Sequence, residues 1–211
     1  MTALVLSSVV SAVVGGSVGR LGRRLLAWLR RGVAAPAGWC EFGAALVGVA
    51  VAVRTAGGLP WWWVPVPLAF GWWAILLAVC DWRSRRLPDA LTLPAYPVVA
   101  FALAVALEHP PTTGTAASSL AGAVLFAGSY ALVRWWSPHG LGAGDVKLAG
   151  VVGAVVGAVA VPAVLVVMAS AAILTVVASA RTAGPVAHGP AILVPAWLCT
   201  LLGPATQLTP W

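Results

Sequence analysis

Charged side chains are scarce in this chain of 211 residues. Only 8% of the residues are Asp, Glu, Lys or Arg, whereas 61% are hydrophobic, and the mean hydropathy is +0.99. A water-soluble domain carries about a quarter charged residues, because its surface faces water. The composition therefore excludes an ordinary soluble domain. Polar stretches are also too short for a separate soluble part, so we expect residues 1–211 to form one integral membrane domain.

Metal-ligand and redox motifs are missing as well. The three cysteines, Cys40, Cys80 and Cys199, are scattered and form no C-x-x-C pair, which excludes a zinc knuckle or a dithiol motif. The histidines at positions 109, 139 and 188 are equally scattered, and the chain has no H-E-x-x-H motif of the kind that binds zinc on a helix. We interpret the histidines as loop or interfacial residues, and we expect neither a metal nor a cofactor.

What the sequence has in abundance is apolar runs separated by short polar clusters. Because a span needs about 20 apolar residues, this pattern predicts an all-α bundle of about eight transmembrane helices, with six to eight as the range. A signal peptide would carry a basic residue before its apolar run. The first run, 2–19, has none, so we expect it to be a retained span. Seven further spans are expected at 39–57, 62–80, 90–107, 117–136, 146–160, 161–180 and 189–205, the long run at 148–180 being divided near Val161-Pro162.

Basic residues outnumber acidic ones by twelve to five, which gives a formal charge of +7. We expect no nucleic-acid binding, because no basic stretch carries the spaced aromatics or fold signals that such binding needs. Lys and Arg instead indicate orientation, since cytoplasmic loops are enriched in them. Eight spans with the N-terminus outside place every basic residue except Arg54 on the cytoplasmic side, together with Asp81, Asp89 and Asp145.

Five of these arginines fall in the short segment 20–39, at positions 20, 23, 24, 30 and 31, with leucines and a tryptophan between them. This spacing suits an amphipathic helix that lies on the anionic lipid of the cytoplasmic surface. A plain orientation anchor explains the same arginines equally well. Both interpretations stay open.

Two acidic residues stand at the ends of apolar runs. Asp81 directly follows the run 75–80, and Asp145 directly precedes the run that begins at Val146. Each has a structural alternative, because Asp145 would cap a helix after a glycine turn and Asp81 would balance the arginines at 83, 85 and 86. Ionisable residues at such depth are costly and usually functional. Two of them at matching depth on separate helices meet the requirement of acid–base peptide hydrolysis.

The chemistry of such a pair follows from electrostatics. Two carboxylates that lie close together share one proton, because both cannot ionise cheaply. The ionised partner acts as a general base toward water, while the protonated partner hydrogen-bonds the scissile carbonyl and later assists the leaving amine. Since the proton belongs to the pair, the sequence does not assign it to either residue.

The residues around both aspartates resemble the type IV prepilin peptidases. The segment from Asp81 to Pro88-Asp89 is similar to their D-x6-P-[N/D] element, and 142–148 (Gly-Ala-Gly-Asp-Val-Lys-Leu) is similar to their G-x-G-D-x-K-L element. The segment 188–193 is similar to their F-G-P-x-L segment, with His188 in place of the aromatic residue. The resemblance covers roughly 75–200 and is faint at the start of the chain.

This resemblance implies an aspartic endopeptidase of the bacterial cytoplasmic membrane, with a site that faces the cytoplasm. Its partners would be prepilin-like precursors, from which family members remove a short basic leader. By the match, Asp81 and Asp145 would be the catalytic dyad, approached by two flexible glycines and flanked by a lysine. The supporting residues would be Gly142, Gly144, Lys147, Pro88 and Asp89.

Two departures and several alternatives bear on this interpretation. Larger members carry a loop with paired C-x-x-C motifs after the first span and methylate the new N-terminus; here 20–39 has no such pair, so we expect no methyltransferase activity. The G-x-S-x-G at 15–19 lacks its strand–turn–helix context. Presenilin-like proteases also use G-x-G-D, but the D-x6-P element favours the prepilin group. A small transporter or a non-catalytic scaffold of a pilus or secretion system is the alternative function. The identity of the substrate and the oligomeric state stay open.

Overall fold

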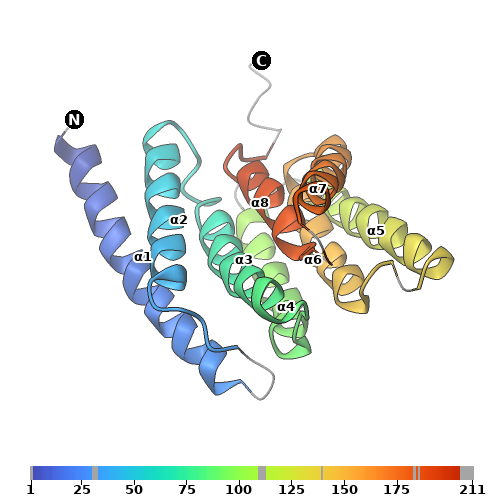
Figure 1. The fold of residues 1–211 in the computed structure, drawn as a ribbon. Coiled ribbons are helices and arrows are strands. Elements are labelled where there is room, and N and C mark those ends of the chain that lie inside the picture. Colours follow the sequence, from blue (N-terminus) through green and yellow to red (C-terminus); the bar gives the residue numbers. More distant parts are fainter. Residues whose placement is uncertain are drawn as a thin grey trace.

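The computed structural model describes residues 2–29, 33–108, 113–138, 140–182, 184 and 186–204. Within these residues the chain forms eight α-helices and no strand (Figure 1). The helices are α1 (Thr2–Trp28), α2 (Trp39–Ala56), α3 (Pro65–Ser84), α4 (Asp89–Leu107), α5 (Thr113–Trp136), α6 (Ala143–Val159), α7 (Val161–Arg181) and α8 (Gly189–Thr200). The all-α class that the apolar runs predict is confirmed.

Six of the helices, α1 to α5 and α7, are long and apolar enough to cross a membrane, so the chain is a multi-pass membrane protein. The other two, α6 and α8, have only 17 and 12 residues. A helix of this length rises at most about 26 Å, less than a hydrocarbon core of about 30 Å. The predicted range of six to eight spans therefore holds, and the two short helices pack against the longer ones.

The long apolar run divides where the sequence predicts. α6 ends at Val159, Ala160 is extended (φ −168°, ψ 136°), and α7 begins at Val161. Pro162 explains the break, because in a continuous helix its ring would clash with the carbonyl four residues earlier. The break lets α7 fold back against α6.

The basic segment near the start differs from the expectation. Residues 20–28 continue α1 without a break, so the predicted boundary between a span at 2–19 and a surface helix is not an element boundary. Arg23 Nε reaches back to Glu41 Oε1 of α2 at 2.7 Å. The arginines at 30 and 31 lie outside the described residues. The connection from α1 to α2 is therefore only 29–38.

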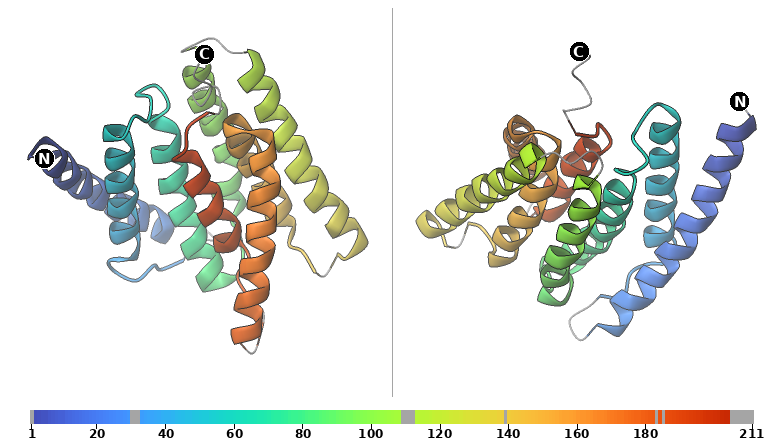
Figure 2. Two further views of the ribbon diagram at one scale, coloured as in Figure 1. Left: turned by 90° about the horizontal axis from the view of Figure 1, so that it is seen from above. Right: turned by 180° about the vertical axis from the view of Figure 1, so that it is seen from behind.

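Glycines let two helix pairs pack with their backbones in contact. A Cβ at Gly15 or Gly19 of α1 would collide with a carbonyl oxygen of α2, and a Cβ at Gly153 of α6 would collide with the Gly122 carbonyl of α5. Small residues permit this approach in membrane helices, where close packing takes over the role of the hydrophobic effect. The two pairs lie on opposite sides of the bundle (Figure 2).

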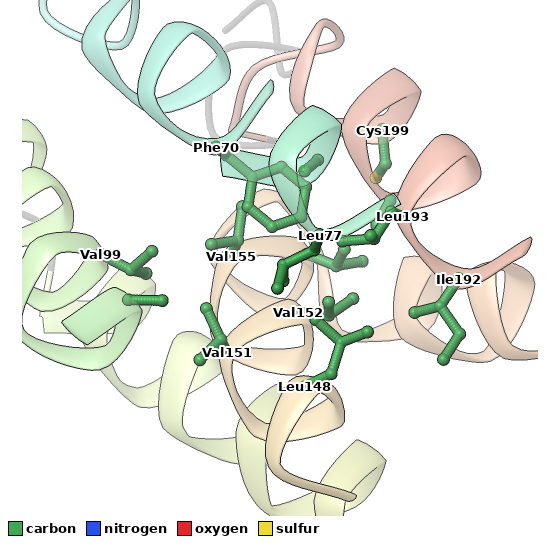
Figure 3. Close-up of a cluster of buried hydrophobic side chains, with 14 of the residues drawn as sticks. Phe70, Leu77, Val99, Leu148, Val151, Val152, Val155, Ile192, Leu193 and Cys199 are labelled. Carbon is green, nitrogen blue, oxygen red and sulfur yellow. The ribbon is translucent and has the colours of Figure 1, made fainter. Parts of the chain in front are cut away.

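α6 is largely buried between other helices. Almost every residue in 148–159 is buried, and the helix contacts α4, α5, α7 and α8. Val152 lies beside Leu77 of α3, and Val155 lies beside Phe70 of the same helix (Figure 3). Because α6 begins with the G-x-G-D segment, this packing anchors Asp145 to the core of the protein.

α8 packs against α3, α6 and α7. Three side-chain bonds to backbone carbonyls tie its C-terminal half and the residue after it: Trp63 Nε1 donates to Thr200 O (2.8 Å), Arg54 Nε donates to Leu201 O (2.9 Å), and Trp197 Nε1 donates to Pro67 O (3.1 Å). α8 is thereby held alongside α3, and its N-terminus lies beside the end of α3.

Candidate active site

The connections α1–α2, α3–α4 and α5–α6 meet at one end of the bundle, because successive helices alternate in direction. They surround a cavity of about 690 Å³. Its lining consists of Val33, Asp81, Ser84, Arg85, Arg86, Leu87, Pro88, Asp89, Gly142, Ala143, Gly144, Asp145 and Lys147. All seven site residues that the sequence predicts are in this lining. Their catalytic and supporting roles stay predictions.

Asp81 lies in the last turns of α3 and is only 6% exposed. Its Oδ2 accepts a hydrogen bond of 2.7 Å from the backbone N–H of Gly189, the first residue of α8. The first N–H groups of a helix have no partner within the helix, so the carboxylate satisfies one of them from 108 positions away in the chain. One oxygen of Asp81 is thereby held, and the side chain still lines the cavity.

The Gly189-Pro190 pair explains how α8 comes so close to Asp81. A Cβ at position 189 would lie 2.9 Å from Asp81 Oδ2 and 3.2 Å from its Cγ, closer than a side chain tolerates. Pro190 has no N–H of its own and suits the first turn of a helix. Glycine followed by proline therefore leaves one N–H in the first two residues of the helix and gives it an unobstructed path to the carboxylate.

Asp145 lies in the first turn of α6 and is half-buried. Its N–H bonds to the carbonyl of Gly142 at 3.2 Å, and Gly142 is extended (φ −67°, ψ 146°). A Cβ on Gly142 would lie 3.0 Å from Asp145 Oδ2, and a Cβ on Gly144 would lie 3.0 Å from the Cβ of Leu87. Neither glycine has a positive φ. Close approach to the carboxylate and to the α3–α4 connection, rather than backbone flexibility, accounts for both glycines.

Residues 68–179 match the sequence model of the type IV leader peptidase family. The matched region includes both aspartates and covers more than half of the chain. This chain belongs to the type IV leader peptidase family. No curated protein and no solved structure matches it significantly. The family makes the chain a peptidase, and the resemblance seen in the sequence is confirmed at this level.

The third acidic residue in the cavity of this leader peptidase family member, Asp89, forms an ion pair with Lys147. Lys147 Nζ bonds Asp89 Oδ1 at 2.6 Å, across the starts of α6 and α4. Tyr96 of α4 donates its hydroxyl hydrogen to the carbonyl of Lys147, also at 2.6 Å. Pro88 precedes α4 in an extended conformation. The ammonium thus lies at the cavity, as the sequence predicts, but its ion-pair partner within the described residues is Asp89.

An arginine of α5 braces the segment that leads to Asp145. Arg134 Nη1 donates to the carbonyl of Leu141 at 2.6 Å. The guanidinium of Arg134 therefore holds the end of the loop 137–142, just before α6 begins.

The polar cluster around His188 is missed by the sequence interpretation, which treats this histidine as a loop residue. Its ring is half-buried, Nε2 lies 2.9 Å from the hydroxyl of Tyr130, and Nδ1 lies 2.7 Å from the hydroxyl of Thr175. Burial lowers the pKa of His188 below its ordinary value, and the Asp81 carboxylate acts in the opposite direction. The signal that points to this cluster is the similarity of 188–193 to the F-G-P-x-L segment, because it places an unusual polar residue beside Gly189.

Proposed function

We propose that this chain is an aspartic endopeptidase with Asp81 and Asp145 as its catalytic dyad. One observation carries the proposal: in a member of a peptidase family, two carboxylates from separate helices line the same cavity at one end of the bundle. A structural cap or a counter-charge would explain each carboxylate alone, but it would not require both of them to face one cavity.

Two carboxylates that line one cavity support a mechanism with one shared proton. The ionised carboxylate takes a proton from water, which attacks the scissile carbonyl, and the protonated carboxylate donates to the carbonyl oxygen and then to the leaving amine. The N–H of Gly189 keeps one Asp81 oxygen in place, which leaves the other for water or substrate. Cleavage needs no group beyond these carboxylates, water and the peptide.

We infer that the substrate is the leader of a prepilin-like precursor and that the cavity opens to the cytoplasm of a bacterium. Charge supports this orientation, because cytoplasmic segments are enriched in Lys and Arg. Among the described residues, the cavity end carries Arg83, Arg85, Arg86, Arg134, Lys147 and Arg181, whereas Arg54 lies at the opposite end of α2. The basic end of α1 then lies near anionic lipid.

We also infer cleavage without N-methylation. A methyltransferase site must bind a methyl donor and hold the new amine beside it. The connection 29–38 between α1 and α2 is too short to build such a site, and the α3–α4 and α5–α6 connections are taken up by the two aspartates.

The test uses a synthetic peptide with a basic leader and a prepilin-like cleavage site, added to membrane vesicles that contain the full chain. Inverted vesicles should cleave the peptide, and right-side-out vesicles should not. The matched control carries both Asp81→Asn and Asp145→Asn and is inserted in equal amount. Mass spectrometry of the product, with a methyl donor present, should show a free amine. Absence of cleavage in inverted vesicles, or equal cleavage by the control, would contradict the proposed peptidase function.

A further inference from the structure

The start of α8 is held differently from its end. The three bonds from Trp63, Arg54 and Trp197 all lie in or beyond its C-terminal half. At the N-terminal end, the described residues offer two ties. One is the bond from Gly189 to Asp81, and the other is the side chain of the preceding residue, His188.

We assign the tautomer of His188 from its hydrogen-bond partners. The Thr175 hydroxyl also lies 2.8 Å from the carbonyl of Ala171, and donation of its single hydrogen to that carbonyl leaves its oxygen to accept from His188. Nδ1 of His188 therefore carries a hydrogen and donates it to Thr175. In the neutral ring Nε2 is then an acceptor, and it receives the hydroxyl hydrogen of Tyr130.

Both sides of the histidine are thus tied to neighbouring helices. The ring joins α5 through Tyr130 and α7 through Thr175, and it stacks on Tyr130 at a centroid distance of 5.8 Å. Its carbonyl accepts from the N–H of Ile192 at 3.2 Å, in the first turn of α8. A shift of the ring therefore moves the backbone that carries the Gly189 N–H.

We propose that His188 is a positioning residue for Asp81: held between Thr175 and Tyr130, it keeps the first residue of α8 at the place where the Gly189 N–H bonds Asp81 Oδ2. The consequence for activity rests on the proposed function of Asp81. The consequence for the Gly189 hydrogen bond does not, and it is measured separately.

The local measurement is hydrogen exchange of the Gly189 amide in the purified full chain. This N–H is the first of a helix and has no partner inside the helix, so its protection reports on the bond to Asp81. Asp81→Ala gives the exchange rate of the Gly189 amide when its hydrogen bond to Asp81 is lost. Thr175→Val, which removes the acceptor of the Nδ1 hydrogen, and His188→Phe, which keeps a flat ring on Tyr130, should each speed exchange at Gly189 about tenfold.

The activity measurement separates positioning from substrate binding. Thr175→Val and His188→Phe should each lower kcat about tenfold and leave KM unchanged, since small displacements of reacting groups cost this much or more. Thr175→Ser keeps the hydroxyl and should restore both the exchange rate and kcat to within about twofold of the original chain. Adding Tyr130→Phe to His188→Phe should lower kcat no further than His188→Phe alone, because the two residues act as one network.

Two controls keep the result interpretable. Ser119→Ala removes a bond from α5 to the carbonyl of Ala154 in α6 and should leave Gly189 exchange unchanged. Exchange across α1 and α2 shows that each variant is folded. Unchanged Gly189 exchange in both Thr175→Val and His188→Phe, or an equal effect of Thr175→Ser, overturns the proposal. Altered exchange in a chain that cleaves no precursor supports the positioning role and overturns the proposed function.

Discussion

The two aspartates of the cavity are held by different parts of the chain. Asp145 is positioned locally, by Gly142 three residues before it and by the loop that Arg134 braces. Asp81 is positioned by Gly189, which lies 108 positions later and belongs to a helix that packs along α3. Both aspartates lie on helices packed in the bundle, but the hydrogen bond beside Asp145 lies within a local turn, whereas the bond to Asp81 comes from another helix.

This difference predicts which substitutions disturb the site most. A local turn adjusts to a change within a few residues, because its backbone is partly exposed. A helix docked in the core cannot shift without disturbing α3, α6 and α7 together, since interiors are close-packed. Changes around α8 should therefore harm the site more than chemically similar changes around the G-x-G-D turn.

The largest effect should come from removing either carboxylate, and here the two regions should not differ. Asp81→Asn and Asp145→Asn each keep the side-chain shape but cannot exchange the proton, so kcat should fall about 10²–10⁴-fold in each. Thermal unfolding should change little, because the Asn oxygen still accepts a backbone hydrogen bond. Peptide cleavage at equal enzyme concentration checks this. Substantial activity in one of the two variants would show that the carboxylates do not act as a pair.

The next largest effect should separate the two regions. In Gly189→Ala the new Cβ lies 2.9 Å, 3.2 Å and 3.3 Å from three atoms of Asp81, whereas in Gly142→Ala it lies 3.0 Å from one oxygen of Asp145 and 3.8 Å from the Cγ. Overpacking at the buried site should cost about 1–3 kcal/mol and lower kcat about a hundredfold. Gly142→Ala should lose less than about tenfold.

The measurements for this pair are kcat and the unfolding midpoint of both variants in the same detergent. The matched control is Gly16→Ala, where a Cβ meets nothing within 4 Å. An effect of Gly142→Ala as large as that of Gly189→Ala would remove the distinction between a local and a docked carboxylate.

A smaller effect is expected at the brace of the G-x-G-D turn. Arg134→Gln loses the charged donor to the Leu141 carbonyl, and a bond from a charged group contributes about 1.5–3 kcal/mol at most. Because part of this is recovered by water, kcat should fall tenfold or less, equivalent to about 1.4 kcal/mol. The control is Arg181→Gln at the exposed end of α7. Hydrogen exchange at Gly189 should stay unchanged, and a change there would mean that the two regions are coupled.

The smallest effect should come from the exposed ion pair. The side chains of Lys147 and Asp89 are 40% and 55% exposed, and exposed pairs contribute about 0–1 kcal/mol. Asp89→Asn should therefore keep activity within a few-fold and leave the unfolding midpoint almost unchanged. A double-mutant cycle that combines Asp89→Asn with Lys147→Met measures the interaction energy of the ion pair, and its repetition at high salt shows how much of that energy is electrostatic. A loss as large as that in the dyad variants would place Asp89 in the chemistry.

Much of the fold could be predicted because hydrophobic runs and prolines act locally. The bounds of α2, α4 and α7 agree with the predicted spans to within a residue or two, and Pro162 marks the break before α7. The helix boundary expected near residue 20 was wrong, because the arginines there end the apolar run but do not end the helix. Charge patterns report on environment, whereas the backbone follows helix propensity and packing.

The sequence by itself determined the membrane class, the order of the helices and seven of the residues that line the cavity, because these depend on composition and on short motifs. Only the tertiary structure decided that Gly189 holds Asp81 and that His188 bonds Tyr130 and Thr175. These contacts join α3, α5, α7 and α8. The physical reason is that a hydrogen bond between distant segments depends on how helices pack, and no local pattern of residues records that packing.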